Sequence, residues 1–128
     1  MQKREIYKCA DCDDVLEVIG TGKCACGAPS CCGREMILKD EKTKEGAGEK
    51  HLPVVEDKGG SVLVKVGSVE HPMDADHWIQ VIEVITKSGI VMRKELSPGD
   101  KPEAVFPVAA GEVEQAREFC NKHGLWAV

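Results

Sequence analysis

The 128-residue sequence has no long apolar run. Its first residues, MQKREIYK, contain no apolar stretch of the kind that forms a signal peptide. No segment approaches the roughly 18 consecutive apolar residues that a membrane span requires. We therefore expect a cytoplasmic protein without a membrane partner. In a reducing compartment the seven cysteines are expected to be metal ligands or redox groups rather than disulfides.

Positive charge is also scarce. The chain has 17 basic and 22 acidic residues, and its net charge is −5. Residues 1–39 hold six of each sign, so the deficit falls entirely on residues 40–128, with eleven basic and sixteen acidic side chains. A nucleic-acid partner would call for a basic face, and we expect none. A small anionic substrate would need local attraction by individual lysines.

Large apolar side chains are missing from residues 39–50, KDEKTKEGAGEK. This charged, glycine-containing segment is typical of a linker or exposed loop, and it divides the chain into residues 1–38 and 51–128. The first part has little aliphatic content. A domain below roughly 40 residues rarely folds without a disulfide, a metal or a partner chain. We therefore expect the cysteines of residues 1–38 to stabilise that domain by binding metal.

Residues 51–128 have the pattern of a β protein. Short segments rich in β-branched residues recur between turn signals, which predicts an all-β sandwich or barrel. The segment 104–108 is expected at a sheet edge because it contains Pro107. Residues 111–120 are ambiguous, since Val113, Ala116 and Cys120 would also share a helix face. The candidate strands are 52–56, 61–66, 78–85, 89–96 and 104–108.

Six of the seven cysteines lie within the first 32 residues. Cys9-x-x-Cys12 and the adjacent pair Cys31 and Cys32 could complete a tetrahedral sulfur site for iron or zinc. Neighbouring side chains of an extended backbone point to opposite faces, so Cys31 and Cys32 can share a metal only through a bend.

Two further thiols, Cys24 and Cys26 in KCACG, could supply ligands instead. Both a structural zinc site and an iron–thiolate electron-transfer centre are compatible with this part of the sequence.

The seventh cysteine, Cys120, lies more than 85 residues beyond the others and three positions before His123. All four histidines follow position 50, each beside a turn signal or a predicted strand end. A blue-copper site is a poor match, because no methionine follows Cys120 and two histidines would be left over. Four imidazoles with one thiolate predict five-coordinate iron with one open position. The candidate ligands are His51, His71, His77, Cys120 and His123.

Several motifs together resemble the desulfoferrodoxin family of two-iron superoxide reductases. They are EIYKCADC, CCGREM, GEKHLPV, VGSVEHPMDADHWIQ, PGDKPEAVF and REFCNKHGLW, which cover nearly the whole chain. The resemblance implies a mainly β protein, with a small desulforedoxin-like iron domain at residues 1–38 and an immunoglobulin-like β-sandwich at residues 51–128. Residues 39–50 would be the linker and active-site loop.

The resemblance also implies the roles of individual residues. Cys9, Cys12, Cys31 and Cys32 match the ligands of a first iron. The four histidines match the equatorial ligands of a catalytic iron, and Cys120 matches its axial thiolate. Glu49 and Lys50 match the glutamate and lysine of a loop over the open position. One departure is a longer loop between Cys12 and Cys31, which carries Cys24 and Cys26.

The activity implied is one-electron reduction of superoxide to hydrogen peroxide, with two irons per chain, a rubredoxin-like electron donor and a homodimer. A non-catalytic iron electron-transfer protein is the alternative, and a structural zinc protein is a third. Trp78 and Trp126 are expected to wall the histidine site, whereas Phe106 and Phe119 are expected in the core.

Overall fold

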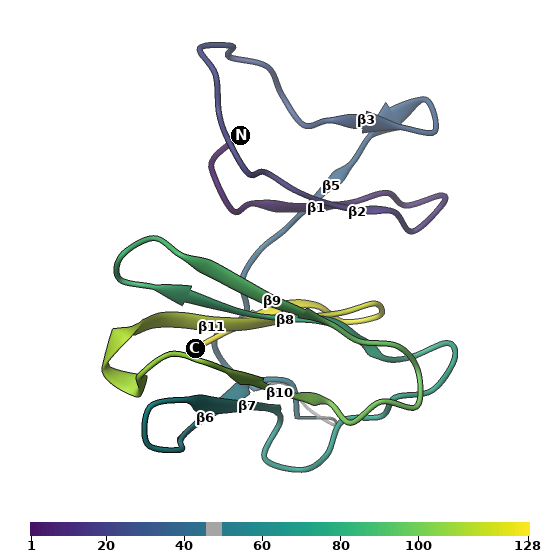
Figure 1. Cartoon of the computed structure of the whole chain (residues 1–128). Coiled ribbons are helices and arrows are strands. Elements are labelled where there is room, and N and C mark those ends of the chain that lie inside the picture. Colours follow the sequence, from purple (N-terminus) through teal and green to yellow (C-terminus); the bar gives the residue numbers. More distant parts are fainter. Residues whose placement is uncertain (46–49) are drawn as a thin grey trace. The chain divides into compact units, whose positions relative to one another are not determined.

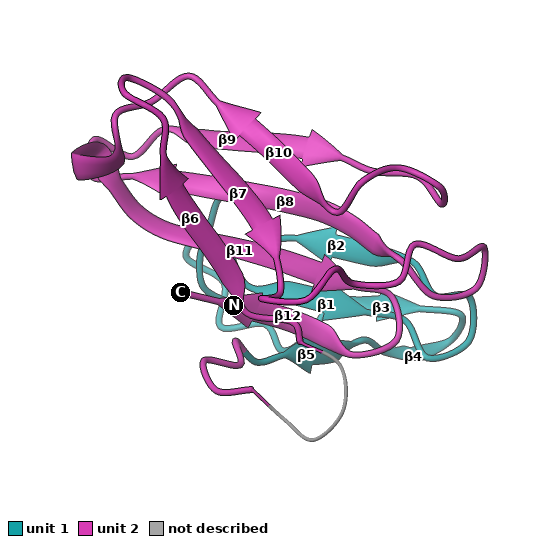
Figure 2. Ribbon diagram, turned by 90° about the horizontal axis from the view of Figure 1, so that it is seen from below, with its two compact units in different colours: residues 1–40 teal, residues 41–128 magenta. Residues whose placement is uncertain are grey.

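The computed structural model describes residues 1–45 and 50–128. Glu49, which the sequence proposes for the active-site loop, lies outside the described residues. The chain forms two compact units, Met1–Asp40 and Glu41–Val128 (Figure 2). Among the described residues, no helix has the length and apolar character needed to cross a membrane.

The first unit is built from five very short strands. β1 (Ile6–Lys8) lies between β2 (Val15–Glu17) and β5 (Ile37–Lys39) in an antiparallel sheet, and β3 (Ser30–Cys31) pairs with β4 (Arg34–Glu35). The small buried cluster consists of Tyr7, Cys9 and Met36. Such a cluster is far smaller than an ordinary domain core, which agrees with the need for a further stabilising element.

The second unit is a sandwich of two antiparallel sheets (Figure 1). The three-stranded sheet has the order β10-β7-β6, and the four-stranded sheet has the order β12-β11-β8-β9. The mainly β fold class predicted from the sequence is confirmed. The strands are β6 (Pro53–Asp57), β7 (Val62–Val66), β8 (Ile79–Thr86), β9 (Val91–Glu95), β10 (Glu103–Phe106), β11 (Val113–Cys120) and β12 (Gly124–Ala127).

Alternating side chains of the two sheets form the core of the sandwich. Val62, Val64 and Val66 of β7 are fully buried, as the period-2 pattern of that segment predicts. Ile82 and Val84 of β8 join the same apolar cluster. Phe106 and Phe119 are both buried, as expected. The edge position expected for the strand before Pro107 is confirmed, because β10 pairs only with β7 in its sheet.

The ambiguous segment 111–120 forms a short 3-10 turn, Ala110–Glu112, followed by the strand β11. β11 pairs with β8 on one side and with β12 on the other, so it is a central strand. Backbone hydrogen bonds along both edges therefore decide against the helix that its apolar spacing also permits. The strand β12 that completes this hairpin was not predicted.

Strand register brings several connections to one end of the sandwich. Pro53 at the start of β6 pairs with Val66 at the end of β7, and Ile79 at the start of β8 pairs with Cys120 at the end of β11. The segment before β6, the β7–β8 connection and the β11–β12 turn therefore meet at the same end. All five residues of the predicted histidine–cysteine site lie in these connections or at their borders.

Candidate metal centres

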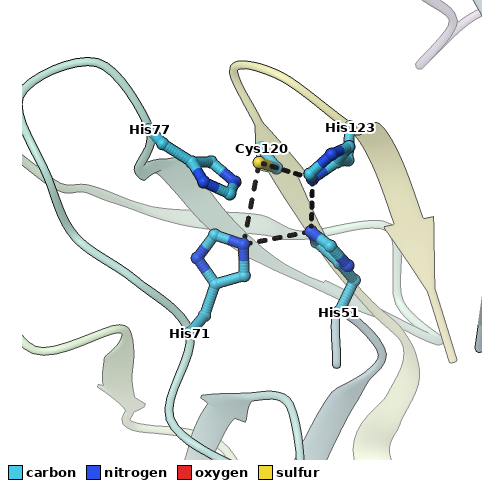
Figure 3. Close-up of side chains that lie close together, drawn as sticks. All are labelled: His51, His71, His77, Cys120 and His123. Carbon is cyan, nitrogen blue, oxygen red and sulfur yellow. Dashed lines mark hydrogen bonds between the residues drawn. The ribbon is translucent and has the colours of Figure 1, made fainter. Parts of the chain in front are cut away.

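The structure brings together the five side chains that the sequence proposes for the second site. One nitrogen from each imidazole and the sulfur of Cys120 lie within 4.8 Å of one another (Figure 3). His51 precedes β6, while His71 and His77 come from the β7–β8 connection. Cys120 ends β11, and His123 lies in the turn that follows. The members are His51, His71, His77, Cys120 and His123.

The four imidazoles form a closed ring. Each is in contact with two others, with ring centroids 4.6–5.0 Å apart and interplanar angles of 63–85°. The order around the ring is His51, His71, His77, His123 and back to His51. The sulfur of Cys120 lies 3.8 Å from Nε2 of His71 and 4.0 Å from Nδ1 of His123. This is a four-nitrogen, one-sulfur donor set.

The hydrogen bond of His71 indicates how its ring is used. Its Nδ1 lies 2.7 Å from the carbonyl oxygen of Pro72, which can only accept, so Nδ1 carries the proton. Its Nε2 then carries a lone pair that points toward the centre of the four imidazoles, 3.0 Å from Nε2 of His51. His51 Nε2 is also 3.1 Å from Nδ1 of His123. A single N–H cannot satisfy all these converging nitrogens, whereas a cation can. The donor set therefore fits a metal, and its composition fits iron.

Trp126 forms one wall of this site, as the sequence predicts. Its indole stacks on the His51 imidazole, and the ammonium of Lys42 lies 4.9 Å from the indole centroid. The same ammonium donates a hydrogen bond of 2.7 Å to the carbonyl oxygen of His123. Lys42 thus links two members of the site, although sequence reasoning assigned it only to the linker. The role expected of Trp78 as a wall stays a prediction.

Asn121 joins two of the connections that carry the site. Its Oδ1 accepts a hydrogen bond of 2.9 Å from the backbone N–H of Trp78, and its Nδ2 donates one of 2.9 Å to the carbonyl of Asp76. Its own backbone N–H donates to the carbonyl of Trp78 at 3.2 Å. These bonds hold the segment around His77 against the residue that follows Cys120. Only the Cys-Asn-x-His motif pointed to this residue, without indicating its partners.

Glu45 is bound to the backbone of a site residue, and the buried Glu118 interacts electrostatically with Glu45. Glu45 accepts hydrogen bonds from the backbone N–H groups of His51 and Leu52, at 2.9 and 2.8 Å, and so fixes the segment before β6. Glu118 is fully buried, and its oxygens have no hydrogen-bond partner within the part of the chain that the structure describes. Burial, with the nearby charge of Glu45, raises the pKa of Glu118 well above its usual range, which favours the neutral carboxyl.

The members of the ring differ in their exposure to solvent. His51 and His71 are buried, with 4% and 3% of their surface exposed, whereas His123 is exposed. Lys50, which immediately precedes His51, is exposed as well. Lys122, the other lysine next to a site residue, has its ammonium 3.7 Å from a carboxylate oxygen of Asp76.

The first unit contains a second donor set. The sulfurs of Cys9, Cys12, Cys31 and Cys32 lie within 4.8 Å of one another, as the sequence predicts for a tetrahedral site. Cys32 has a φ of 51° and Gly33 a φ of 80°, which is the bend that lets two adjacent thiols converge. The Arg34 guanidinium donates a 2.7 Å hydrogen bond to Asp11 and joins the two ligand segments.

The thiols of this set behave as a cluster rather than singly. Backbone N–H groups of Cys12 and Asp11 lower the pKa of Cys9 to about 7, which favours its thiolate. Hydrogen bonding to Cys12 and Cys9 raises the pKa of Cys31 far above its ordinary value. A cation bound by these four converging sulfurs would favour their thiolate forms.

Cys24 and Cys26 do not belong to that donor set. They are bonded to each other as a disulfide, with their Cα atoms 5.2 Å apart. The cysteines were expected to be metal ligands or redox groups rather than disulfides, and the exclusion of a disulfide is wrong for this pair. The physical reason is local: one intervening residue brings two exposed sulfurs within disulfide geometry without any contribution from the core. Cys31 and Cys32, and not this pair, lie beside Cys9 and Cys12.

Comparison with known proteins gives matches over nearly the whole chain. Residues 43–128 match the desulfoferrodoxin family profile. The chain is 48% identical to the desulfoferrodoxin of Syntrophotalea carbinolica over 126 residues, which is 98% of this chain and 96% of that protein. It is 32% identical to the superoxide reductase of Pyrococcus abyssi over 108 residues, 70% of this chain and 94% of that one.

Solved structures give the same picture. The crystal structure of the superoxide reductase from Treponema pallidum aligns with a TM-score of 0.78 and 33% identity, covering 97% of this chain and 96% of that one. The chain is thus similar in fold to solved superoxide reductases. The chain belongs to the desulfoferrodoxin family. Its four-cysteine group and its four-histidine, one-cysteine group match the two iron sites of that family.

Proposed function

We propose that the chain is a superoxide reductase, which converts superoxide to hydrogen peroxide with one external electron and two protons. One observation carries the proposal: four imidazoles form a closed ring around a common centre, with one thiol beside them and solvent at His123. An electron carrier would not need a site that solvent can reach, because it exchanges electrons without binding a substrate. Family membership and the similarity to superoxide reductases support the same reading.

In this proposal four imidazole nitrogens would hold the iron: Nε2 of His51 and His71, Nδ1 of His123 and a nitrogen of His77. Cys120 would bind the same iron as a thiolate, and these five ligands would leave one coordination position for the substrate. Ferrous iron bound there would supply the single electron, and the thiolate of Cys120 would strengthen this donation. The buried imidazoles would exclude water from three sides of the site.

Lys50 would attract the anionic substrate. The chain has a net charge of −5, so a negatively charged substrate needs a local cation near the opening. Lys50 adjoins His51 and is exposed, whereas the ammonium of Lys122 is already close to Asp76. Lys50 is therefore the better candidate of the two. Glu49 would occupy the open position in the resting state, and solvent would provide the protons.

The remaining assignments follow the same scheme. Residues 51–128 would be the catalytic domain, residues 39–50 the linker and active-site loop, and residues 1–38 a second iron domain that can take part in electron transfer. A rubredoxin-like protein would return the electron, and the protein would act as a cytoplasmic homodimer. Without the external electron the site would react once and stop, which distinguishes a reductase from a dismutase.

The test combines metal analysis with spectroscopy. Iron and zinc are measured per chain, and visible spectra of the reduced protein are recorded before and after addition of superoxide. We expect two irons and a new thiolate-to-iron band when superoxide oxidises the histidine site. The variant Cys120→Ser should lack this band, whereas Cys24→Ser/Cys26→Ser should retain it. A ferrous protein that does not react with superoxide, and a ferric site that binds neither azide nor cyanide, would favour the carrier instead.

A further inference from the structure

The disulfide Cys24–Cys26 lies in the connection between β2 and β3, away from any strand. Every residue from 19 to 27 is exposed. A side chain added at Gly20 or Gly22 would meet no atom within 4 Å, so the segment stands in open space. Both sulfurs are therefore within reach of a reactant approaching from solvent.

The position of the bond argues against a structural role. The ring closed by this disulfide contains only one residue, Ala25, between the two cysteines. A disulfide stabilises a fold chiefly by closing a long loop of the unfolded chain, and its effect falls as the loop shortens. The ends of the connection are held by other bonds: the N–H of Val18 donates to Glu5 at 2.9 Å, and that of Met36 donates to Pro29 at 2.8 Å. Hydrogen bonds other than the disulfide therefore hold both ends of this connection.

A metal-binding role is also disfavoured. Four other cysteines already complete a tetrahedral set in the same unit, and Cys24 and Cys26 are not among them. Two exposed cysteines that are joined, yet neither tie the fold together nor bind metal, match the properties of labile disulfides, since exposure and ready access to sulfur favour exchange.

We propose that Cys24 and Cys26 form a second redox site, a reversible dithiol/disulfide pair that exchanges with thiol-containing reductants. A thiolate of the reductant attacks one sulfur of the pair, the sulfur–sulfur bond breaks, and a mixed disulfide forms while the other cysteine leaves as a thiolate. A second thiolate of the reductant attacks the reductant's own sulfur in the mixed disulfide, and the protein's cysteine leaves as a thiolate. The chain then carries two thiols and the reductant is a disulfide, so two electrons and two protons have moved. A small disulfide oxidant reverses the sequence. The proposal does not depend on superoxide chemistry.

The experiment uses the full-length, iron-loaded protein under anaerobic conditions. It is equilibrated in buffers with a graded ratio of reduced to oxidised glutathione, and then alkylated without unfolding. Peptide mapping by mass spectrometry counts the alkyl groups on Cys24 and Cys26. We expect two labels per chain in the most reducing buffer, none in the most oxidising one, and a single reversible transition between them. Iron content should stay constant throughout.

The double variant Cys24→Ser/Cys26→Ser is the matched control. It should lose both reversible labels, keep two irons per chain and unfold at the same denaturant concentration as the parent. A pair that stays oxidised in excess dithiothreitol while the protein remains folded would overturn the proposal in favour of a structural disulfide. A pair that remains as thiols in oxidised glutathione, or a double variant that loses iron from the four-cysteine set, would overturn it as well.

Discussion

The indole of Trp126 stacks on the imidazole of His51, with ring centroids 4.6 Å apart and 11° between the planes. His51 precedes the three-stranded sheet and Trp126 lies in β12 of the four-stranded one, so the stack joins the two layers of the sandwich beside the histidine ring. The ring of His51 cannot rotate without displacing the indole. Preorganisation of one imidazole is thus built into the packing of the fold.

Replacing Trp126 should loosen the metal site in a way that depends on the shape of the new side chain. We expect Trp126→Leu to weaken metal retention about 10–100-fold, the range typical for loss of a side chain that orients a ligand. Trp126→Phe should stay within a few-fold of the parent, because it keeps an aromatic face against His51. The indole N–H has no hydrogen-bond partner among the described residues, so its loss costs little.

The measurement is the rate and extent of iron loss from the histidine site to a chelator. The unfolding of each variant in denaturant is followed in parallel, to separate a general loss of stability from a local change. Equal iron retention in Trp126→Leu and Trp126→Phe would show that the stack does not orient His51.

Asn121 offers a test of how the two connections are held together. Asn121→Ala removes both side-chain hydrogen bonds, to the N–H of Trp78 and the carbonyl of Asp76. We expect a loss of about 1–3 kcal/mol in the free energy of unfolding, because the partly buried N–H of Trp78 loses its partner. The visible band of the iron site should also shift, since His77 and Cys120 lie next to these bonds.

Asn121→Asp is the graded comparison for this position. It keeps an acceptor for the N–H of Trp78 but places an acceptor against the carbonyl of Asp76, so it should also weaken the site. The shift of the visible band should be absent from Gln80→Ala, which alters a neighbouring residue of β8 without removing either hydrogen bond. An Asn121→Ala spectrum identical to that of the parent would contradict a positioning role.

Lys50 should control how fast the substrate arrives. We expect Lys50→Ala to lower the second-order rate constant with superoxide about 10-fold at low ionic strength, and less at high salt, because a single exposed charge steers an anion over a short range. The ferric spectrum should be unchanged, since the variant leaves all five donor side chains in place. Lys122→Ala should change the rate much less, because Asp76 already lies close to that ammonium.

Pulse radiolysis or stopped flow with a superoxide source measures these rates directly. Similar rate constants for Lys50→Ala and the parent at low salt would remove Lys50 from the mechanism. A larger effect for Lys122→Ala would transfer the role to that residue.

Gly67 fixes the path of the chain next to Lys50. Its φ is +80°, and a Cβ added there would lie 2.5 Å from the carbonyl oxygen of Lys50 and 2.7 Å from that of Val69. Gly67→Ala should therefore lower the free energy of unfolding by more than the roughly 1 kcal/mol of a strained φ alone. It should also alter the spectrum of the iron site, because the Lys50 carbonyl is directly joined to His51.

Gly89→Ala supplies the matched control for this prediction. Gly89 has a φ of +87°, but a Cβ there would meet nothing within 4 Å. The difference between the two variants in denaturant unfolding measures the cost of the backbone contact. Equal destabilisation, with unchanged iron spectra in both, would show that the contact near Lys50 relaxes without consequence.

Much of this protein was determined by local sequence patterns. Alternation in residues 61–66 and the β-branched segments at 78–85 and 89–96 predict strands correctly, because burial of one face of a strand has a period of two. The chemistry of imidazole and thiol identifies the candidate ligands by residue type alone. The turn residues beside each histidine indicate that these ligands lie in loops at strand ends.

Other features were decided only by the tertiary structure. The short strands of the first unit carry too few apolar residues to be recognised, and β11 was ambiguous until β8 and β12 paired with it on both sides. The roles of Lys42 and Asn121 depend on partners that are distant in sequence and close only after the sheets form. The pairing of Cys24 with Cys26 depends on the conformation of an exposed loop, which residue type does not specify. Sequence periodicity reports burial, whereas these contacts depend on strand register and loop geometry, which the whole fold sets.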